Sequence, residues 1–373
     1  MPMYMDFHQF ETVSVEAVKE AHMADKLVQD RYGVRYIQFW VNEAAGTVFC
    51  LVEGPNPEAC EACHRIAHGN MACNLQEVEP GFFKLFMGDK QPIHHGLAMN
   101  TAGAVDLANR TLLVADIRGV TDIEDSSDYK QLHVPIKPKN RVVDALAAFD
   151  GRFIEHAAND SLVGVFDSPI NAIRCAQSIQ NDLLEKMRLK GKNSEWNIIF
   201  RLALNQGQPL TKSTGFFEVA TKQAIRLCMV AGPNQIVFSS NLQELYAMEN
   251  VALEANLPRS CIKILTPTEE NFLHALFELT EQHLQTTSFN VNNLCELIGV
   301  SRPQLYRKTT SLTGKSPNNF IKDLRMQKAW RLLKSREGNI SEVALEVGYS
   351  NPSYFSKVFQ ASFGHKPSAL AGS

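Results

Sequence analysis

The sequence predicts a multidomain α+β protein, in which two mixed domains of helices and strands precede an all-helical domain. Three observations lead to this prediction. Residues 1–80 follow the order strand, helix, strand, strand, helix, strand, and residues 110–239 alternate strands and helices around a buried apolar strand. Residues beyond 290 show helical spacing of apolar side chains and contain two helix-turn-helix patterns. A chain of 373 residues has room for two or three domains.

The composition is that of a globular protein, with 45% hydrophobic and 21% charged residues. No apolar run approaches the ~20 residues that cross a bilayer. The N-terminus lacks the basic and apolar regions of a signal peptide. We therefore expect a cytoplasmic protein without a membrane partner, and we expect its eight cysteines to serve as core residues, metal ligands or a redox pair rather than structural disulfides.

The element order of residues 1–80 fits a ferredoxin-like α+β sandwich. The expected strands are Asp6–Phe10, Val34–Asn42, Thr47–Glu53 and Asn74–Val78, and the expected helices are Ser14–Tyr32 and Pro57–His68. Residues 81–108 hold four glycines and show little periodicity, so we expect a linker with at most a short helix.

Histidine and cysteine side chains are dense in this first domain: His8, His22, Cys50, Cys60, Cys63, His64, His68 and Cys73. His64 and His68 are four residues apart on one expected helix, so they share a face and can hold one ion. Imidazole and thiolate ligands suit nickel, copper or zinc rather than calcium or magnesium. The alternative is that the histidines cap helices and the cysteines pack in the core. The group of eight histidine and cysteine side chains as a whole favours a metal site over this alternative.

The same stretch contains several short motifs: Ala21-His22 with Asp25, Tyr32-Gly-Val-Arg-Tyr36, Trp40, Gly46-Thr-Val-Phe-Cys-Leu-Val-Glu53 and His64-Arg-Ile-Ala-His-Gly69. In these motifs it resembles a small nickel-binding family with a ferredoxin-like fold. The resemblance implies that residues 1–80 form a metal-binding sensor domain for a transition metal such as nickel, with His22, Cys50, His64 and His68 as ligands.

The second mixed domain, residues 109–250, begins with a buried strand around Asp116. Its element order and several residues resemble the catalytic domain of class III nucleotidyl cyclases. The resemblance places the family's magnesium-binding aspartates at Asp116 and Asp160 and its transition-state arginine at Arg226. Further matches are Phe166-Asp-Ser-Pro, Ala172-Ile-Arg-Cys-Ala and Ala231-Gly-Pro-Asn-Gln-Ile-Val-Phe-Ser239.

Three departures from that family argue against catalysis. Asn159 stands where the family has a glycine, Lys222 stands at the transition-state asparagine, and His156 stands at the purine-selecting lysine. We therefore expect a domain that no longer cyclises, and a protein that is not an enzyme. Nucleotide binding stays open. Because cyclase domains of this family pair head to tail, the resemblance also implies a homodimer.

Residues 251–265 are expected to be a hinge, and residues 266–373 a helical domain with two tandem helix-turn-helix patterns. Gly299 and Gly348 lie at the two turns, where a residue without Cβ can adopt positive φ. A long amphipathic helix, Phe320–Leu333, separates the two patterns. Residues 301–373 contain 12 Lys and Arg against 4 Asp and Glu, although the whole chain carries a net charge of −3. Concentrated positive charge on a tandem helical unit favours binding to the phosphates and major groove of DNA.

Six motifs follow one another in this region: Ser301-Arg-Pro-Gln-Leu-Tyr-Arg-Lys, Thr313-Gly-Lys-Ser-Pro317, Leu324-Arg-Met-Gln-Lys-Ala, Val343-Ala-Leu-Glu-Val-Gly-Tyr, Tyr354-Phe-Ser-Lys-Val-Phe and Phe363-Gly-His-Lys-Pro-Ser368. In these motifs the region resembles the DNA-binding domain of the AraC family of bacterial transcription regulators. The resemblance implies double-stranded DNA as the partner. It places Arg302, Pro303, Tyr306 and Arg307 of the first recognition helix, and Asn351, Ser353 and Lys357 of the second, toward the groove.

Taken together, the sequence predicts a sequence-specific DNA-binding transcriptional regulator that responds to a transition metal or a small ligand. The alternative is an active nucleotidyl cyclase fused to a DNA-binding domain. A metal store that merely carries a helix-turn-helix is disfavoured by the basic C-terminal pattern.

Overall fold

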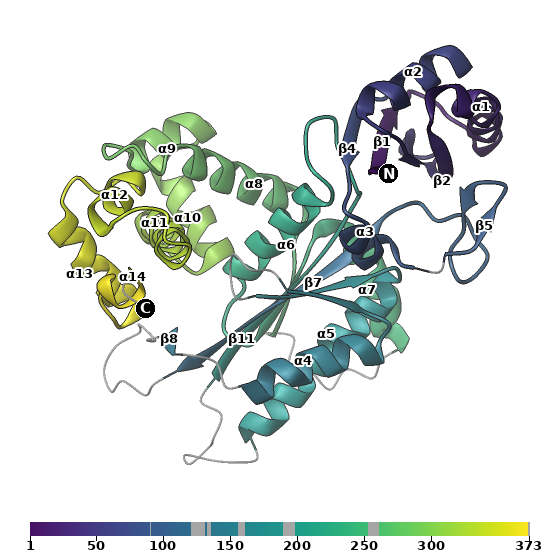
Figure 1. The fold of residues 1–373 in the computed structure, drawn as a ribbon. Coiled ribbons are helices and arrows are strands. Elements are labelled where there is room, and N and C mark those ends of the chain that lie inside the picture. The colour runs from purple at the N-terminus through teal and green to yellow at the C-terminus, as the bar shows by residue number, and fades with distance from the viewer. Residues whose placement is uncertain are drawn as a thin grey trace.

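The computed structural model describes residues 1–89, 91–120, 131–132, 136–155, 161–188, 198–252 and 261–371. It contains an N-terminal sheet domain, a central sheet domain and a C-terminal helical domain (Figure 1). Among the described helices, none combines the length and the hydrophobicity that a membrane span requires.

The first sheet has the strand order β4-β1-β3-β2-β6-β5. Its strands are β1 (Met3–Gln9), β2 (Arg35–Asn42), β3 (Thr47–Glu53), β4 (Asn74–Glu77), β5 (Ile93–His94) and β6 (Leu97–Ala98), and its helices are α1 (Val15–Val28) and α2 (Pro57–Ala67), with a 3-10 turn η1 (Gln29–Tyr32). The side chain of Ser14 caps α1 by accepting a hydrogen bond from the Ala17 amide.

Alternation along β3 divides the apolar residues between the two faces of this sheet. Cys50 and Val52 belong to the small cores beneath α1 and α2. Phe49 and Leu51 belong instead to a large core that continues into the central and helical domains. The α1/α2 face therefore encloses its own interior, while the opposite face is buried against the rest of the chain.

The segment 81–108, expected to be a linker, includes the anticipated short helix as α3 (Pro80–Met87). It also contains β5 and β6, which the sequence analysis did not anticipate. The amide of Phe39 on β2 donates to the carbonyl oxygen of Gly96 at 2.8 Å, so the segment extends the first sheet.

The second sheet has the order β13-β12-β11-β7-β10-β9, and β8 pairs with β7. In Figure 1, helices α4, α5 and α7 lie on one side of this sheet and α6 lies on the other. On β7, Leu113 and Ala115 pack in the α4/α5 core and Leu112 and Val114 pack in the core that contains α6. The elements are β7 (Arg110–Val120), β8 (Gln131–Leu132), α4 (Ile136–Ala148), β9 (Arg152–Glu155), β10 (Leu162–Phe166), α5 (Pro169–Arg188), β11 (Ile198–Gly207), α6 (Glu218–Val230), β12 (Gln235–Phe238), η3 (Ser240–Leu242), α7 (Gln243–Ala252) and β13 (Ile262–Ile264).

The helical domain consists of α8 (Pro267–Gln282), α9 (Val291–Ile298), α10 (Arg302–Thr313), α11 (Pro317–Lys334), α12 (Ile340–Glu346), α13 (Pro352–Phe363) and α14 (Ser368–Ala371). Its two halves have different interiors. Leu294, Leu305 and Leu312 of the first half join the large core shared with the central domain. The second half has a core of its own, which includes Val343, Phe355 and Phe359.

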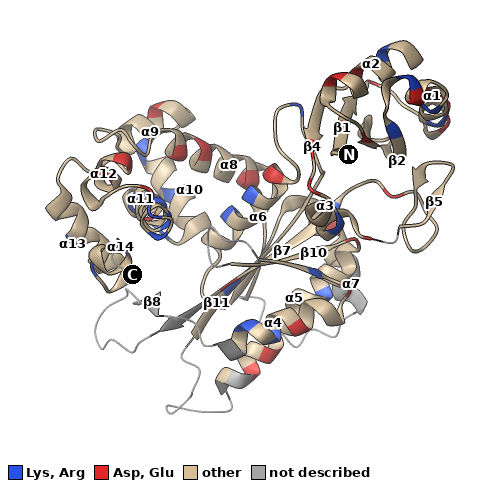
Figure 2. Ribbon diagram, viewed as in Figure 1, with Lys and Arg blue, Asp and Glu red and all other residues tan. Residues whose placement is uncertain are grey.

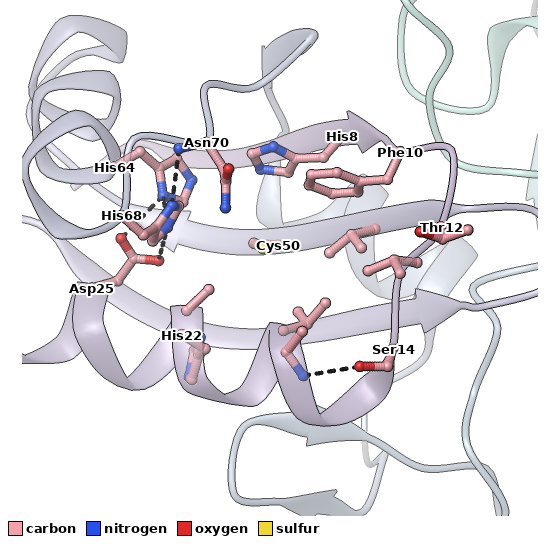
Figure 3. A pocket seen from close by; sticks show the side chains of 15 residues that line it. His8, Phe10, Thr12, Ser14, His22, Asp25, Cys50, His64, His68 and Asn70 are labelled. Atoms are coloured by element: carbon pink, nitrogen blue, oxygen red, sulfur yellow. Dashed lines mark hydrogen bonds and ion pairs between the residues drawn. The ribbon is translucent and has the colours of Figure 1, made fainter.

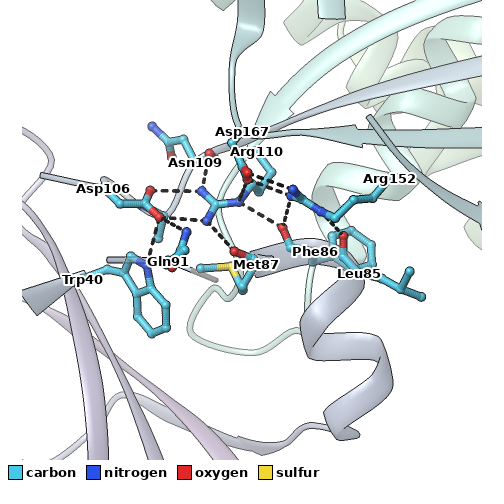
Figure 4. A network of polar contacts seen from close by, with 11 residues as sticks. Trp40, Leu85, Phe86, Met87, Gln91, Asp106, Asn109, Arg110, Arg152 and Asp167 are labelled. Atoms are coloured by element: carbon cyan, nitrogen blue, oxygen red, sulfur yellow. Dashed lines mark hydrogen bonds and ion pairs between the residues drawn. The ribbon is translucent and has the colours of Figure 1, made fainter. Parts of the chain in front are cut away.

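A buried guanidinium joins the first and second sheet domains (Figure 4). Arg110, at the start of β7, has a side chain that is 1% exposed. It donates to both carboxylate oxygens of Asp106, at 3.0 and 2.8 Å, and to the carbonyl oxygen of Phe86 at 2.9 Å. Asp106 also accepts a hydrogen bond from the indole of Trp40 on β2 at 3.1 Å. Arg152 donates to the carbonyl oxygens of Leu85 and Phe86, so two arginines bind the otherwise unpaired carbonyls at the end of α3.

Candidate metal centre and nucleic-acid interface

Five acidic and imidazole side chains converge between the first sheet and its two helices, and Figure 3 labels all of them except Asp6. Asp6 and His8 come from β1, Asp25 comes from α1, and His64 and His68 come from the end of α2. They form two overlapping groups, Asp6 with His8 and His64, and Asp25 with His64 and His68, and within each group the potential ligand atoms lie within 4.8 Å of one another. Asp6, His8, Asp25 and His64 are buried.

His64 is the centre of this cluster. Its Nε2 lies 2.7 Å from Asp6 Oδ2, and its Nδ1 lies 3.0 Å from Asp25 Oδ1. His68 Nε2 lies 3.2 Å from Asp25 Oδ2 and 3.1 Å from Nδ1 of His64. Two nitrogens bound to one four-coordinate ion lie roughly 3.3 Å apart, because each bond to the metal is about 2.0–2.1 Å long. The spacing of the two imidazoles and the carboxylate therefore fits a shared cation.

The electrostatics of the cluster also favour positive charge. Burial would lower the pKa of His64, but its hydrogen bonds to Asp25 and Asp6 raise that pKa to about 10. Burial would raise the pKa of Asp25, but the hydrogen bonds from His64 and His68 bring the net shift downward. Asp6 behaves in the same way, since the neighbouring His8 and His64 outweigh its burial and lower its pKa. Two buried carboxylates that stay ionised need positive charge nearby to compensate them. Either the protonated imidazole of His64 or a metal ion can supply that charge.

The structure brings together two of the four predicted metal ligands, His64 and His68, and places the other two nearby. His22 lines the same cavity, but it is packed against Phe39, with ring centroids 4.9 Å apart, and burial lowers its pKa to about 4. Cys50 also lines the cavity; its amide donates to Asp6 Oδ1 at 2.7 Å, and burial raises the pKa of its thiol. Neither residue is a member of the two ligand groups.

Asp6 and Asp25 are not among the metal ligands that the sequence predicts, and His8 belongs only to the wider group of candidate ligands. Asp6 and His8 are two residues apart on a strand, so they point to one face, and this period-2 spacing was the available signal. Asp25 was noted as part of the family pattern without a role. Cys60 and Cys63 lie in the small core with Tyr36, where burial raises their pKa values to about 12 and about 11. They pack as apolar side chains there.

The cluster occupies one end of a cavity of about 460 Å³. The remaining wall is largely apolar and comes from the start of α1 and from β1 and β3, with Phe10, Val13, Ala17, Val18 and Val48. The cluster of acidic and imidazole side chains therefore has access to an open space rather than being enclosed on all sides.

The cyclase-like candidates are not assembled into one site in the described part of the chain. Asp116 on β7 lies 3.5 Å from the guanidinium of Arg201. Asp160 lies outside the described residues, as do His156 and Asn159. Arg226 on α6 is bound by two carboxylates of α8, with 2.8 Å from Nη1 to Glu278 and 2.7 Å from Nη2 to Glu281.

Lys222, one turn earlier on α6, shares the same two carboxylates with Arg226. Its ammonium lies 3.3 Å from Glu278 and 3.2 Å from Glu281. The two positions that the cyclase resemblance assigns to the transition state are thus both paired with the first helix of the helical domain. Figure 2 shows basic positions on α6 beside acidic positions on α8.

Helices α10 and α13 present the residues predicted to read DNA. Arg302, Pro303, Arg307, Asn351, Ser353 and Lys357 are exposed, and Tyr306 is half-buried. Leu305 and Phe355 are fully buried, as their helical spacing predicted. Ser301 and Asn351 cap the two helices by accepting hydrogen bonds from backbone amides, so the side chain of Asn351 is already engaged at the N-terminus of α13. The hydroxyl of Tyr306 accepts a hydrogen bond from Asn318 at 3.2 Å.

Two separate family models match the two ends of the chain. Residues 4–78 match the family described as nickel responsive protein SCO4226-like, and residues 294–372 match a helix-turn-helix domain. Neither match reaches the central sheet domain.

Curated proteins also resemble part of this chain. The HTH-type transcriptional regulator MtrA of Neisseria gonorrhoeae is 34% identical over 79 residues, which are 21% of this chain and 26% of that protein. The HTH-type transcriptional regulator CdhR of Pseudomonas aeruginosa is 39% identical over 75 residues, 20% of this chain and 22% of that protein. The aligned segments thus span only about a quarter of these relatives.

Solved structures resemble parts of this chain as well. SCO4226 from Streptomyces coelicolor A3(2) is 35% identical, with 20% of this chain and 94% of that one covered and a TM-score of 0.20. The DNA-binding domain of AdpA, solved in complex with a target DNA, is 28% identical. The match covers 26% of this chain and 87% of the AdpA chain, with a TM-score of 0.25.

Proposed function

We propose that this protein, which joins an N-terminal domain of the nickel-responsive SCO4226-like family to a C-terminal helix-turn-helix domain of the AraC family, is a sequence-specific transcriptional regulator that responds to a transition metal. One observation carries the metal part of this proposal. His64 and His68 present nitrogens 3.1 Å apart beside the carboxylate of Asp25, in a cluster that also includes the buried Asp6. Nickel, copper and zinc accept such mixed nitrogen and oxygen ligands.

The proposed domain organisation follows the expected boundaries, with a ferredoxin-like sensor at residues 1–80, a cyclase-like domain at 109–250, a hinge at 251–265 and a DNA-binding domain at 266–373. The order β4-β1-β3-β2 with α1 and α2 on one face supports the ferredoxin-like assignment. The pairing of β5 and β6 with the first sheet argues for counting these two strands with the sensor instead of with a free connection.

DNA binding is supported by the exposed basic residues of the recognition helices, which lie on a domain carrying excess positive charge. We infer that α10 and α13 enter successive major grooves on one side of the duplex, with their centres about one helical turn apart, because the continuous helix α11 separates the two motifs. Arg307 is the side chain best suited to guanine, since its planar fork can bind O6 and N7 together.

A metal can regulate DNA binding only if it favours one arrangement of the protein over another. The first sheet offers a physical connection, because its Phe49 and Leu51 face shares a core with the central and helical domains. Asp6 sits on β1, directly paired with β3, so a change in ligand geometry at Asp6 acts on the strand that carries those residues.

The metal site is tested by measuring the nickel and zinc content of the full chain after loading and exhaustive dialysis. The wild type should retain about one ion per chain. A His64→Ala/His68→Ala double variant should lose it, whereas the matched His94→Ala/His95→Ala variant should not, because those two histidines are exposed and outside the cluster. Equal metal content in wild type and the His64/His68 variant would place the site elsewhere.

The regulatory part is tested separately by DNA binding of the same proteins, with and without the retained metal. The operator has first to be selected from a random duplex library. A metal-dependent change in affinity in the wild type, absent in the double variant, supports regulation. Unchanged affinity in both would leave a DNA-binding protein with a structural metal.

For the central domain we propose dimerisation without cyclase activity. The pairing of Arg226 and Lys222 with Glu278 and Glu281 supports the lack of cyclase activity, because those cations are not available to a triphosphate while α8 is docked. The dimer rests on the cyclase resemblance. Incubation of the purified chain with ATP or GTP and manganese should yield no cyclic nucleotide. Product that disappears in an Asp116→Ala variant would establish the cyclase alternative instead.

A further inference from the structure

A second cavity, of about 580 Å³, lies where the central and helical domains meet. Its wall includes residues of four helices, α3, α6, α8 and α11, and of the strands β9 and β10. It is distinct from the metal cluster, since the two cavities share no residue. Its volume falls within the ~300–1,000 Å³ of most small-molecule sites.

Most of the wall is apolar and much of it is aromatic. Phe82 and Phe86 of α3 and Phe216, just before α6, form one side, with ring centroids 4.9 to 6.1 Å apart. Ile225 and Met229 of α6 and Leu324 of α11 form the other side. Phe82 remains 38% exposed, so the aromatic side is only partly covered by the protein itself. Rings and aliphatic carbons at this density favour an apolar, planar body.

The charged groups of the wall are paired, with one exception. Arg226 and Lys222 are bound to the carboxylates of α8, and Glu218 accepts a hydrogen bond from the amide of Gly215 at 2.8 Å. Arg331 of α11 lies at the exposed rim, and no carboxylate pairs with it among the described residues. Leu324, Gln327 and Arg331 follow one another at helical spacing, so the same face of α11 offers an apolar contact, an amide and a cation.

We propose that this cavity is a binding site for an apolar organic acid, with a body about the size of two fused rings and a single anionic group. The aromatic side and Ile225 hold the body, while the guanidinium of Arg331 binds the carboxylate or a similar anion as a charge-assisted pair. This effector would act in addition to the metal. Because α11 connects the two helix-turn-helix motifs, a bound acid would touch the DNA-binding unit and the central domain at once.

The test uses two matched fluorescent probes with the full chain. Anilinonaphthalene sulfonate carries the anionic group, and N-phenyl-1-naphthylamine has the same rings without it. Thr221→Phe, which fills the cavity from α6, should abolish the binding of both probes at this site. Arg331→Gln should weaken the sulfonate roughly tenfold, as expected for one charge-assisted hydrogen bond, and leave the neutral probe unchanged.

Lys334→Gln is the control, because it removes a cation from the same helix outside the cavity wall. Circular dichroism first has to show that the Thr221→Phe variant is folded like the wild type. If this variant still binds the sulfonate probe as the wild type does, the probe does not bind in this cavity. The role of Arg331 in binding the anionic group would be overturned by either of two results. Arg331→Gln could weaken both probes equally, or Lys334→Gln could weaken the sulfonate as much as Arg331→Gln does. The titration needs neither DNA nor metal, so it can fail while the regulator proposal stands, and the reverse holds too.

Discussion

The ammonium of Lys263 donates a hydrogen bond of 2.8 Å to the carbonyl oxygen of Leu312. Lys263 lies on β13, the edge strand of the central sheet, and Leu312 lies in the last turn of α10, the first recognition helix. The last carbonyls of a helix lack partners within the helix and carry partial negative charge, so a cation there is stabilising. The central domain thus holds the end of a helix that is expected to read DNA.

Replacing Lys263 should loosen this attachment. We expect Lys263→Met to lower the free energy of unfolding by about 1–2 kcal/mol, the range for a partly buried cation at a helix C-terminus. Lys212→Met is the control, since Lys212 is exposed in a loop. Thermal and urea unfolding of both variants provide the comparison. If the two lose the same amount, the hydrogen bonds to Ser311 and Leu312 contribute nothing specific.

Arg226 and Lys222 bind the same carboxylates, but their burial differs. The Arg226 side chain is 6% exposed and lies over the Phe277 ring at 5.3 Å, whereas the Lys222 side chain is 45% exposed. Breaking a buried pair leaves an unsatisfied charge, so Arg226→Ala should cost about 2–4 kcal/mol. Lys222→Ala should cost at most about 1 kcal/mol. Chemical denaturation gives both values, and a larger loss for Lys222 would contradict the assigned geometry.

The same pairing predicts a dependence on pH. Burial would raise the pKa of Glu278, but hydrogen bonds and charges from Arg226 and Lys222 lower it below its ordinary value of 4.5. A carboxyl whose folded pKa is depressed stabilises the fold above its unfolded pKa, and this contribution is lost as the pH falls through the folded pKa. Glu278→Gln should therefore reduce the difference in stability between pH 6 and pH 3. An unchanged pH profile would show that Glu278 does not titrate against Arg226.

The proposed metal site predicts that nickel affinity responds differently to substitutions at two positions on α1, Asp25 and His22. Asp25 contacts both His64 and His68, so Asp25→Asn should weaken nickel binding by at least about tenfold, as is usual for groups that bind or orient metal ligands. His22→Phe should keep the affinity within a few-fold, because His22 packs against Phe39 outside the ligand groups. Competition with a fluorescent chelator measures both. A strong effect of His22→Phe would restore His22 as a ligand.

DNA readout is predicted most sharply at Arg307. Arg307→Ala should cost about 1–3 kcal/mol and relax the preference at one base pair of the selected operator. Arg307→Lys keeps the charge but loses the planar fork, so it should relax the preference while losing less affinity. Replacing Lys366, which is exposed beyond α13, should weaken all sequences alike and flatten the salt dependence. A uniform loss across single-base variants for Arg307→Ala would make it a phosphate contact.

Local signals made the helical domain predictable. Ser301 and Asn351 as N-caps and Gly299 as a C-cap place the helix boundaries, and helical spacing turns Leu305 and Phe355 inward. The spacing of His64 and His68 likewise stays within one helix. The remaining ligands could not be chosen in this way, because Asp6 and Asp25 reach His64 from a strand and another helix. The pairing of Arg226 with Glu281 depends on how two domains dock, which no local pattern encodes.

The interactions of Arg110 couple the stability of the first sheet domain to that of the second. Its charge is buried, and its partners are the α3 carbonyls, Asp167 of the central domain and Asp106, which is itself bound to Trp40 of the first sheet. If residues 81–108 unfolded with the first domain, the guanidinium would keep Asp167 but lose Asp106 and the α3 carbonyls, so the central domain would lose stability as well. A fragment cut between residues 80 and 110 would separate groups that melt together in the intact chain.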